Sequence, residues 1–323
     1  MIKISKYFTL LALFFVFTNC LDKNTPKVDV SAIDVTIDVH RFEQKFYTIS
    51  PNKLGVLKAE YPYLFPSSNT DSVWLSKMQN KDEQLLFTES QKLYNNFSKE
   101  TIQLESLFKH IKYYYPKFKS PKVITILTNV DYDNNVVVTD EFLFISLDIF
   151  LGKDNEIYQN FPEYIKQNYT KKHLIVAVAE KFVEKKIVPI SNQTYLYNMI
   201  QEGKKLALSQ AFLPSVSASE IIGYTNEQFL WAAQSEAEIW KYFIQNKMLY
   251  STDPKLKNRF IEEAPFSKFF LEIDRDSPGK IGAWFGWQIV NAYIKNNKTS
   301  LQQVILTEND EIFKNSKYKP RKN

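Results

Sequence analysis

Two carboxylates on neighbouring apolar runs are the strongest candidates for chemistry in this sequence. Glu180 follows the apolar run Leu174–Ala179, and Glu202 lies on a second amphipathic run, Met199–Ala207. A zinc site of the His-Glu-x-x-His type places two imidazoles on one helix face at i and i+4, with the intervening Glu as general base. A Glu on a later helix would supply the third ligand, so the order of the two carboxylates fits such a site.

The two imidazoles of that site are missing. Ala179 and Val183 stand at the positions that would carry them, and neither side chain has a lone pair to give to zinc. His173 precedes Ala179 by six residues, so it cannot replace either imidazole at that spacing. The sequence therefore retains the carboxylates of a metal site without its histidines.

Three interpretations of the glutamates remain open on spacing alone. Glu180, Glu184 and Glu202 could be the ligands of a working metallohydrolase with an unusual donor set. Glu180 and Glu202 could instead be vestiges of a lost site, where two carboxylates alone would hold zinc weakly. The simplest interpretation is that Glu180 and Glu184 form the solvated face of a helix and Glu202 is an ordinary surface residue.

A leader occupies the first residues of the chain. Lys3 and Lys6 precede an apolar stretch, Tyr7–Phe17, that is too short to span a bilayer, and Cys20 follows it. Because Cys20 is the only cysteine, it cannot form an internal disulfide. We predict a signal peptide over residues 1–19, a lipid-modified Cys20 with a polar tether over 20–30, and one folded domain over 31–323.

Composition excludes some classes of function. With 44% hydrophobic residues the chain can bury a sizeable core, and its formal charge of +5 is small for 323 residues. No basic cluster with interleaved aromatic residues is present, so we predict no nucleic-acid partner. The sequence also has no Gly-rich phosphate loop and no Gly-x-Ser-x-Gly motif, and we predict no cofactor.

The elements that must position Glu180 and Glu202 follow from periodicity. Alternating residues predict a strand over Asp34–Arg41, and apolar runs predict further strands at Val123–Leu127 and in a hairpin, Val136–Ser146. Helical patterns dominate after residue 155. The expected fold class is α+β, with a small N-terminal sheet and a mostly helical remainder.

Two helical stretches near the C-terminus could form walls of a pocket. Gly282 and Gly286 lie one turn apart, which predicts that another backbone packs closely there, and Trp284 and Trp287 flank them. Glu236 lies on an earlier helix. Pure packing and a pocket wall are both open as roles for these residues.

The chain resembles the gliding motility lipoprotein GldB family of the Bacteroidetes phylum and, through it, the wider group of predicted zinc peptidases of gluzincin type. The resemblance rests on ordered blocks along the chain: the leader to Cys20, Val39–Glu43, Tyr61–Phe65, Leu147–Gly152, Glu180, Gln201–Gly203, Ser235–Phe243 and Pro278–Val290.

The resemblance implies a lipoprotein needed for gliding motility that supports the type 9 secretion machinery, with a zincin-like core. It implies partners among the envelope proteins of that machinery and attachment to a membrane through acylated Cys20, facing the periplasm from either membrane. Because the histidines are absent, we expect no enzyme activity and no metal, with a scaffold role or an active metallopeptidase as alternatives. The expected cleft residues are Ala179, Glu180, Val183, Glu202, Glu236, Trp284 and Trp287.

Overall fold

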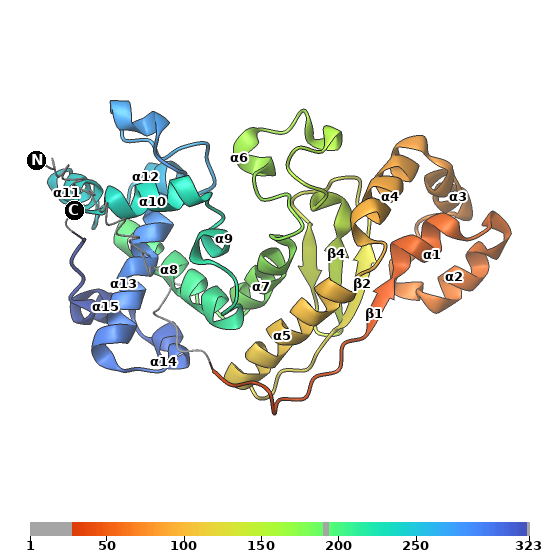
Figure 1. The fold of residues 1–323 in the computed structure, drawn as a ribbon, viewed down its shortest axis with the longest axis horizontal. Coiled ribbons are helices and arrows are strands. Elements are labelled where there is room, and N and C mark those ends of the chain that lie inside the picture. Colours follow the sequence, from red (N-terminus) through yellow and green to blue (C-terminus); the bar gives the residue numbers. More distant parts are fainter. Residues whose placement is uncertain (1–27, 190–193, 322–323) are drawn as a thin grey trace, which may run out of the picture.

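A small mixed sheet lies between two groups of helices (Figure 1). The computed structural model describes residues 28–189 and 194–321. The strands are β1 (Val39–Arg41), β2 (Lys122–Ile126), β3 (Val136–Val138) and β4 (Phe142–Ser146), in the order β1-β2-β4-β3. Strands β1, β2 and β4 are parallel, and β3 runs antiparallel to β4. The predicted hairpin is thereby confirmed.

The first predicted strand is shorter than expected. Exposure alternates along the chain from Val35 to Val39, as the sequence pattern predicts, but only Val39–Arg41 pairs with β2. The residues before Val39 are extended without a partner strand. The period-2 pattern therefore identified the buried face correctly and overestimated the length of the pairing.

Five α-helices of the N-terminal half follow β1 and precede β2 in the chain. The last two of them are separated by a short break at Asn95–Phe97. Phe46, Tyr61 and Phe65 belong to a small separate core formed by the first helices. These elements are α1 (Phe42–Thr48), α2 (Leu54–Glu60), α3 (Asp71–Gln79), α4 (Lys81–Tyr94) and α5 (Ser98–Tyr114).

The remainder is helical, which confirms the α+β class. Helices α8 to α15 gather on the side of the molecule opposite α1 to α3, and α7 lies between that group and the sheet (Figure 1). The elements are α6 (Glu163–Lys166), α7 (Leu174–Glu184), α8 (Tyr195–Phe212), α9 (Ala218–Ile222), α10 (Asn226–Gln234), α11 (Glu236–Gln245), α12 (Lys255–Phe260), α13 (Ile281–Asn297), α14 (Leu301–Leu306) and α15 (Asn309–Ser316).

The backbones of α8 and α13 touch at a pair of glycines. A Cβ added to Gly286 would lie 1.6 Å from the carbonyl oxygen of Met199, and one added to Gly203 would lie 2.2 Å from the backbone of Gly286. At Gly282 an added Cβ would lie 2.9 Å from the carbonyl oxygen of Phe260. The predicted close approach is confirmed, and it fixes α8 against α13.

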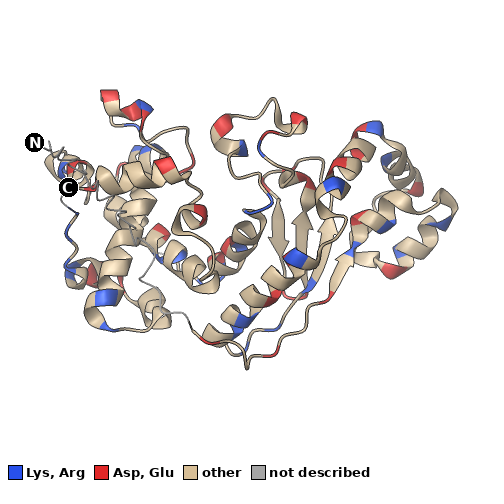
Figure 2. Cartoon of the chain, in the orientation of Figure 1, with Lys and Arg blue, Asp and Glu red and all other residues tan. Residues whose placement is uncertain are grey.

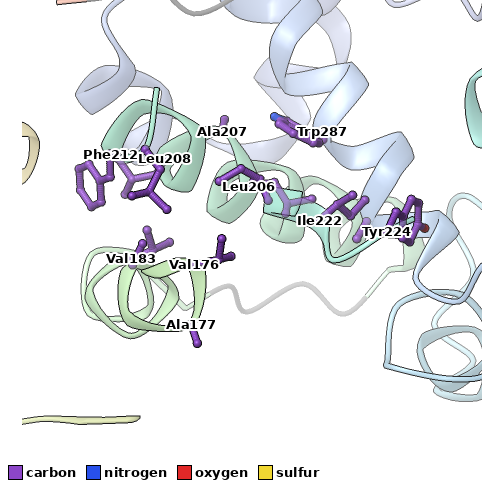
Figure 3. Packing of buried hydrophobic residues seen from close by; sticks show 14 of the residues in the cluster. Val176, Ala177, Val183, Leu206, Ala207, Leu208, Phe212, Ile222, Tyr224 and Trp287 are labelled. Atoms are coloured by element: carbon purple, nitrogen blue, oxygen red, sulfur yellow. The ribbon is translucent and has the colours of Figure 1, made fainter. Parts of the chain in front are cut away.

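The large core joins the sheet to the helical half. Figure 3 shows Val176 and Val183 pointing from α7 toward α8, where Leu206 and Leu208 lie. These four side chains are at most 8% exposed. Among the described residues, no helix combines the length and apolarity that crossing a membrane requires. Acidic and basic residues are interspersed along the ribbon (Figure 2).

Candidate functional site

A pocket of about 160 Å³ lies where α7, α8 and the start of α13 meet. Its lining combines an apolar surface with charged groups and one hydroxyl. The lining residues are Glu180, Val183, Glu184, Glu202, Lys205, Leu206, Ser209, Lys280 and Ala283. The pocket therefore contains both carboxylates that the sequence singled out, Glu180 and Glu202.

Helical spacing explains why these residues share one pocket. On α7, Glu180, Val183 and Glu184 stand at i, i+3 and i+4, which places them on one face. On α8 the lining residues start at Glu202 and recur at i+3, i+4 and i+7. The glycine beside Glu202 makes the contact with α13, so the same crossing that joins the helices brings Glu202 to the pocket.

The start of α13 closes the third side. Lys280 is the N-cap residue and adopts a left-handed backbone conformation, with φ of 59°, and Ala283 follows one turn later. A left-handed conformation is uncommon for a residue with a side chain. It turns the chain into α13 directly after Gly279, so Lys280 reaches the pocket lining.

Most charges of the lining are paired. Lys205 Nζ lies 2.7 Å from a carboxylate oxygen of Glu202, and Lys181 Nζ lies 3.4 Å from one of Glu184. Lys280 Nζ lies 3.6 Å from a carboxylate oxygen of Glu263. In the described parts of the chain, no hydrogen bond or ion pair within 4.0 Å involves the carboxylate of Glu180.

Burial raises the pKa of the Glu180 carboxyl above its ordinary value of 4.5. The charges of His173 and Lys280 oppose that rise in pKa, while the negative charges of Glu263 and Glu184 add to it. A carboxyl whose pKa is raised by desolvation costs free energy when it is ionised. The pocket thus holds one acidic group whose charge the protein itself leaves largely uncompensated.

Comparison with protein families decides the identity of the chain. The family model described as gliding motility protein GldB matches residues 23–320. The chain belongs to the GldB family. Membership makes it a gliding motility lipoprotein, associated with the motility machinery of the cell envelope. Neither the curated proteins nor the solved structures contain a significant match to it.

Three blocks that carried the resemblance to the GldB family meet at the pocket. They are Glu180 on α7, Gln201–Gly203 on α8, and the segment Pro278–Val290 that contains the start of α13. Gly203 and Gly286 hold the second and third blocks in backbone contact. Segments more than a hundred positions apart in the sequence thereby build one site.

The structure places the other predicted cleft residues away from the pocket lining. Ala179 is fully buried, and Trp284 and Trp287 are 1% and 4% exposed within the large core. Glu236 on α11 is also buried, and its carboxylate accepts a hydrogen bond from the Tyr318 hydroxyl, 2.5 Å away. The predicted cleft therefore needs correction at these four positions, because packing and the C-terminal segment cover them.

The structure separates Glu180 from Glu184, which the simplest interpretation placed together on a solvated helix face. Glu184 is exposed, as a solvated helix face requires, whereas Glu180 is half-buried in the pocket lining that it shares with Lys280. Glu202 is half-buried and paired with Lys205. The apolar run before Glu180 hid this difference, because periodicity alone does not tell which side of α7 a neighbouring helix covers.

Sequence reasoning missed Lys205, Ser209 and Lys280. Stepping along the α8 face from Glu202 at i+3 and i+7 would have found the first two. No comparable signal points to Lys280, because its position depends on the chain reversal before α13. Its closeness to Glu180 follows only from tertiary structure.

The described residues contain no group of three or more His, Cys, Asp or Glu side chains that could hold a metal ion. The proposed donor set of Glu180, Glu184 and Glu202 is therefore not arranged as a metal site. The Nδ1 atom of His173 lies 3.1 Å from a carboxylate oxygen of Glu220. Cys20 and the leader lie outside the described residues.

Proposed function

We propose that this GldB-family protein is a catalytically inactive, peptidase-like lipoprotein whose pocket binds a protein partner of the motility machinery. Acylated Cys20 holds it at a membrane with the folded domain in the periplasm, where it supports type 9 secretion. More than one acyl chain on Cys20 makes such anchoring stable. The partner is another envelope protein of that machinery.

One observation carries this proposal. The pocket lies at the helices where the sequence pattern would place a metal, yet apolar side chains stand at both imidazole positions. Val183 forms part of the pocket wall, and Ala179 is packed inside the core. Neither Val183 nor Ala179 offers a ligand for zinc, and the pocket beside Val183 leaves space for a group from another molecule.

The size of the pocket supports binding rather than cleavage. A volume of about 160 Å³ corresponds to about five water molecules at roughly 30 Å³ each. Clefts that hold drug-sized ligands are about two to six times larger, at about 300–1,000 Å³. The pocket fits one side chain of a partner and does not fit an extended peptide substrate.

In-cell photo-crosslinking tests the binding function. A photo-crosslinking amino acid replaces Lys205 in the pocket wall or, as a matched control, the exposed Lys241 on α11. We expect position 205 to give an adduct with a second envelope protein that position 241 does not give. Glu180→Gln should diminish the adduct. A chain that supports gliding but gives no adduct from position 205 would favour a purely structural scaffold.

Metal analysis and peptidase assays test the proposed catalytic inactivity, and acyl labelling tests the proposed lipid anchor. The purified full-length protein should contain no stoichiometric zinc and should not hydrolyse peptides. Zinc that is bound in stoichiometric amount and lost on Glu202→Gln would instead favour an active metallopeptidase. Cys20→Ala should abolish incorporation of labelled fatty acid, and persistent labelling would refute the anchor.

A further inference from the structure

The carboxylate of Glu180 is the one acidic group of the pocket lining without a cation beside it. Glu202 has Lys205 at 2.7 Å, and Glu184 has Lys181 at 3.4 Å. Within the described chain no Lys, Arg or His nitrogen lies within 4.0 Å of the Glu180 carboxylate. Glu180 is half-buried, and a carboxylate that is partly removed from water is stabilised when a cation or a hydrogen-bond donor reaches it.

The two lysines of the lining do not make the pocket a site for anions. Lys205 is already paired with Glu202, and Lys280 faces Glu263 with 3.6 Å between nitrogen and oxygen. Both cations are therefore matched by carboxylates. Since the lining has three glutamates and two lysines, the unmatched charge in the pocket is negative and lies at Glu180.

A second observation points to a ligand at the same place. Ser209 lines the pocket and is only 2% exposed, yet among the described residues its hydroxyl has no hydrogen-bond partner. The hydroxyl oxygen is not among the buried unpaired side-chain atoms of the described chain, so it opens on the pocket. Its presence in the wall provides an oxygen that can accept a hydrogen bond from an incoming N–H group.

The remaining wall suits an aliphatic chain. Val183, Leu206 and Ala283 are buried side chains that present carbon to the pocket. A long cationic side chain has this same division, with an apolar stem and a charged nitrogen at its end. The volume of about 160 Å³ is sufficient for one such side chain.

We propose that the pocket receives a single lysine or arginine side chain of the partner protein, with its cationic head at Glu180 and Ser209 and its stem against Val183, Leu206 and Ala283. This inference rests on the proposed binding function and adds the chemistry of the group that is bound. The partner would then present an exposed basic residue at the contact.

Titration of the full-length protein in detergent with capped single amino acids tests the inference. The probes are the Nα-acetyl methylamides of lysine, arginine, norleucine and glutamate, followed by calorimetry or NMR. We expect the lysine or arginine probe to bind with a Kd on the order of 1 mM, which is typical of a weak single contact. The neutral norleucine probe and the anionic glutamate probe should bind about ten-fold more weakly or worse.

Variants locate the binding group. Glu180→Gln should weaken the cationic probe about ten-fold or more, because it removes the charge and keeps the shape. Ser209→Ala should weaken it about two- to five-fold, as expected for a neutral hydrogen bond. Glu262→Gln is the matched control: Glu262 is exposed, is paired with Lys257 at 2.7 Å and is not part of the lining. Melting temperatures no lower than that of the wild type would show that each variant is folded.

Three results would overturn the inference: no binding by either cationic probe, tighter binding of the glutamate probe, or equal binding by wild type and Glu180→Gln. In any of these cases an adduct from position 205 would still support a binding pocket for another chemistry. Conversely, cationic probes that bind at Glu180 without any adduct in cells would uphold the inference about the pocket and reject the proposed partner.

Discussion

The two faces of α8 differ in how closely they are packed against other parts of the protein. One face, with Met199, Gly203 and Ala207, presses on α13 so closely that no Cβ fits at Gly203. The other face carries the polar part of the pocket lining, starting at Glu202, next to open space. The same helix thus combines a region without free volume and a region with unused volume and an unpaired charge.

This difference separates the residues that stabilise the fold from the residues that we propose to bind a partner. Backbone contact at Gly203 and Gly286 fixes the position of α8, and any added atom must move a helix. The side chains of Glu180 and Ser209 make no hydrogen bond or ion pair within the described chain, so truncating them costs the fold little. Substitutions on the two faces should therefore differ most in what they change.

The largest effect is expected at the glycine contact. Gly286→Ala places a methyl group about where the Met199 carbonyl oxygen lies, 1.6 Å from the ideal Cβ position. We expect the free energy of unfolding to fall by about 3 kcal/mol or more, measured by urea denaturation.

Gly55→Ala is the matched control for that substitution. Gly55 lies within α2, and nothing is within 4 Å of an added Cβ. Alanine there should raise the free energy of unfolding by about 0.5 to 1 kcal/mol through its helix propensity. If Gly286→Ala did not lower the free energy of unfolding and instead behaved like the control, α8 and α13 would not be in close contact.

The next effect concerns the two positions where a zinc site would need imidazoles. Ala179→His forces a ring into the fully buried core and should lower the free energy of unfolding by about 3 kcal/mol. Val183→His should cost less, about 1 kcal/mol, because one side of Val183 faces the pocket. Thermal melts compare the two. Equal losses would mean that Val183 has no space in front of it.

A smaller effect of opposite sign is expected at Glu180. Glu180→Gln removes an unpaired, partly buried charge and should raise the free energy of unfolding at pH 7, by up to about 1 kcal/mol. Because burial raises the pKa of Glu180 above 4.5, the folded chain binds that proton more tightly than the unfolded chain does. Lowering the pH from 7 toward 4.5 therefore stabilises the wild type relative to the variant.

Denaturation curves of both proteins across this pH range provide the measurement. The two stabilities should converge below pH 4.5, where the carboxyl is protonated in both folded and unfolded chains. Glu184→Gln, at an exposed position, should change stability by less than about 0.5 kcal/mol at every pH. A gap between wild type and Glu180→Gln that is independent of pH would contradict the burial of the charge.

The smallest effect is expected at Ser209. Ser209→Ala breaks no hydrogen bond of the described chain, so the free energy of unfolding should change by less than about 0.5 kcal/mol. Urea denaturation checks this. A loss of 1 kcal/mol or more would indicate that the hydroxyl has a structural role rather than a role in binding.

The sequence predicted the elements of the fold better than the site. Residue periodicity identified the hairpin of β3 and β4 and the helices α7 and α8, because burial of one face repeats along each element. The glycine spacing also predicted a close backbone contact at Gly286. These signals are local, and they need no knowledge of which elements meet.

The members of the pocket depended on contacts that the sequence does not encode locally. Glu236 was expected in the cleft, yet Tyr318, from the far C-terminal segment, covers it. Lys280 enters the pocket through a left-handed turn before α13. Whether Glu180 faced solvent or another helix was set by the packing of α13 on α8, which the periodicity of α7 alone could not reveal.

Gliding of cells that carry Glu180→Gln in place of the wild-type chain is the most direct test of the central claim. Glu262→Gln, at an exposed position outside the pocket lining, is the control, and immunoblots verify equal abundance of all three proteins. We expect Glu262→Gln cells to glide at wild-type speed and Glu180→Gln cells to stop or slow severely. Wild-type gliding by Glu180→Gln cells would contradict a role for the pocket in motility.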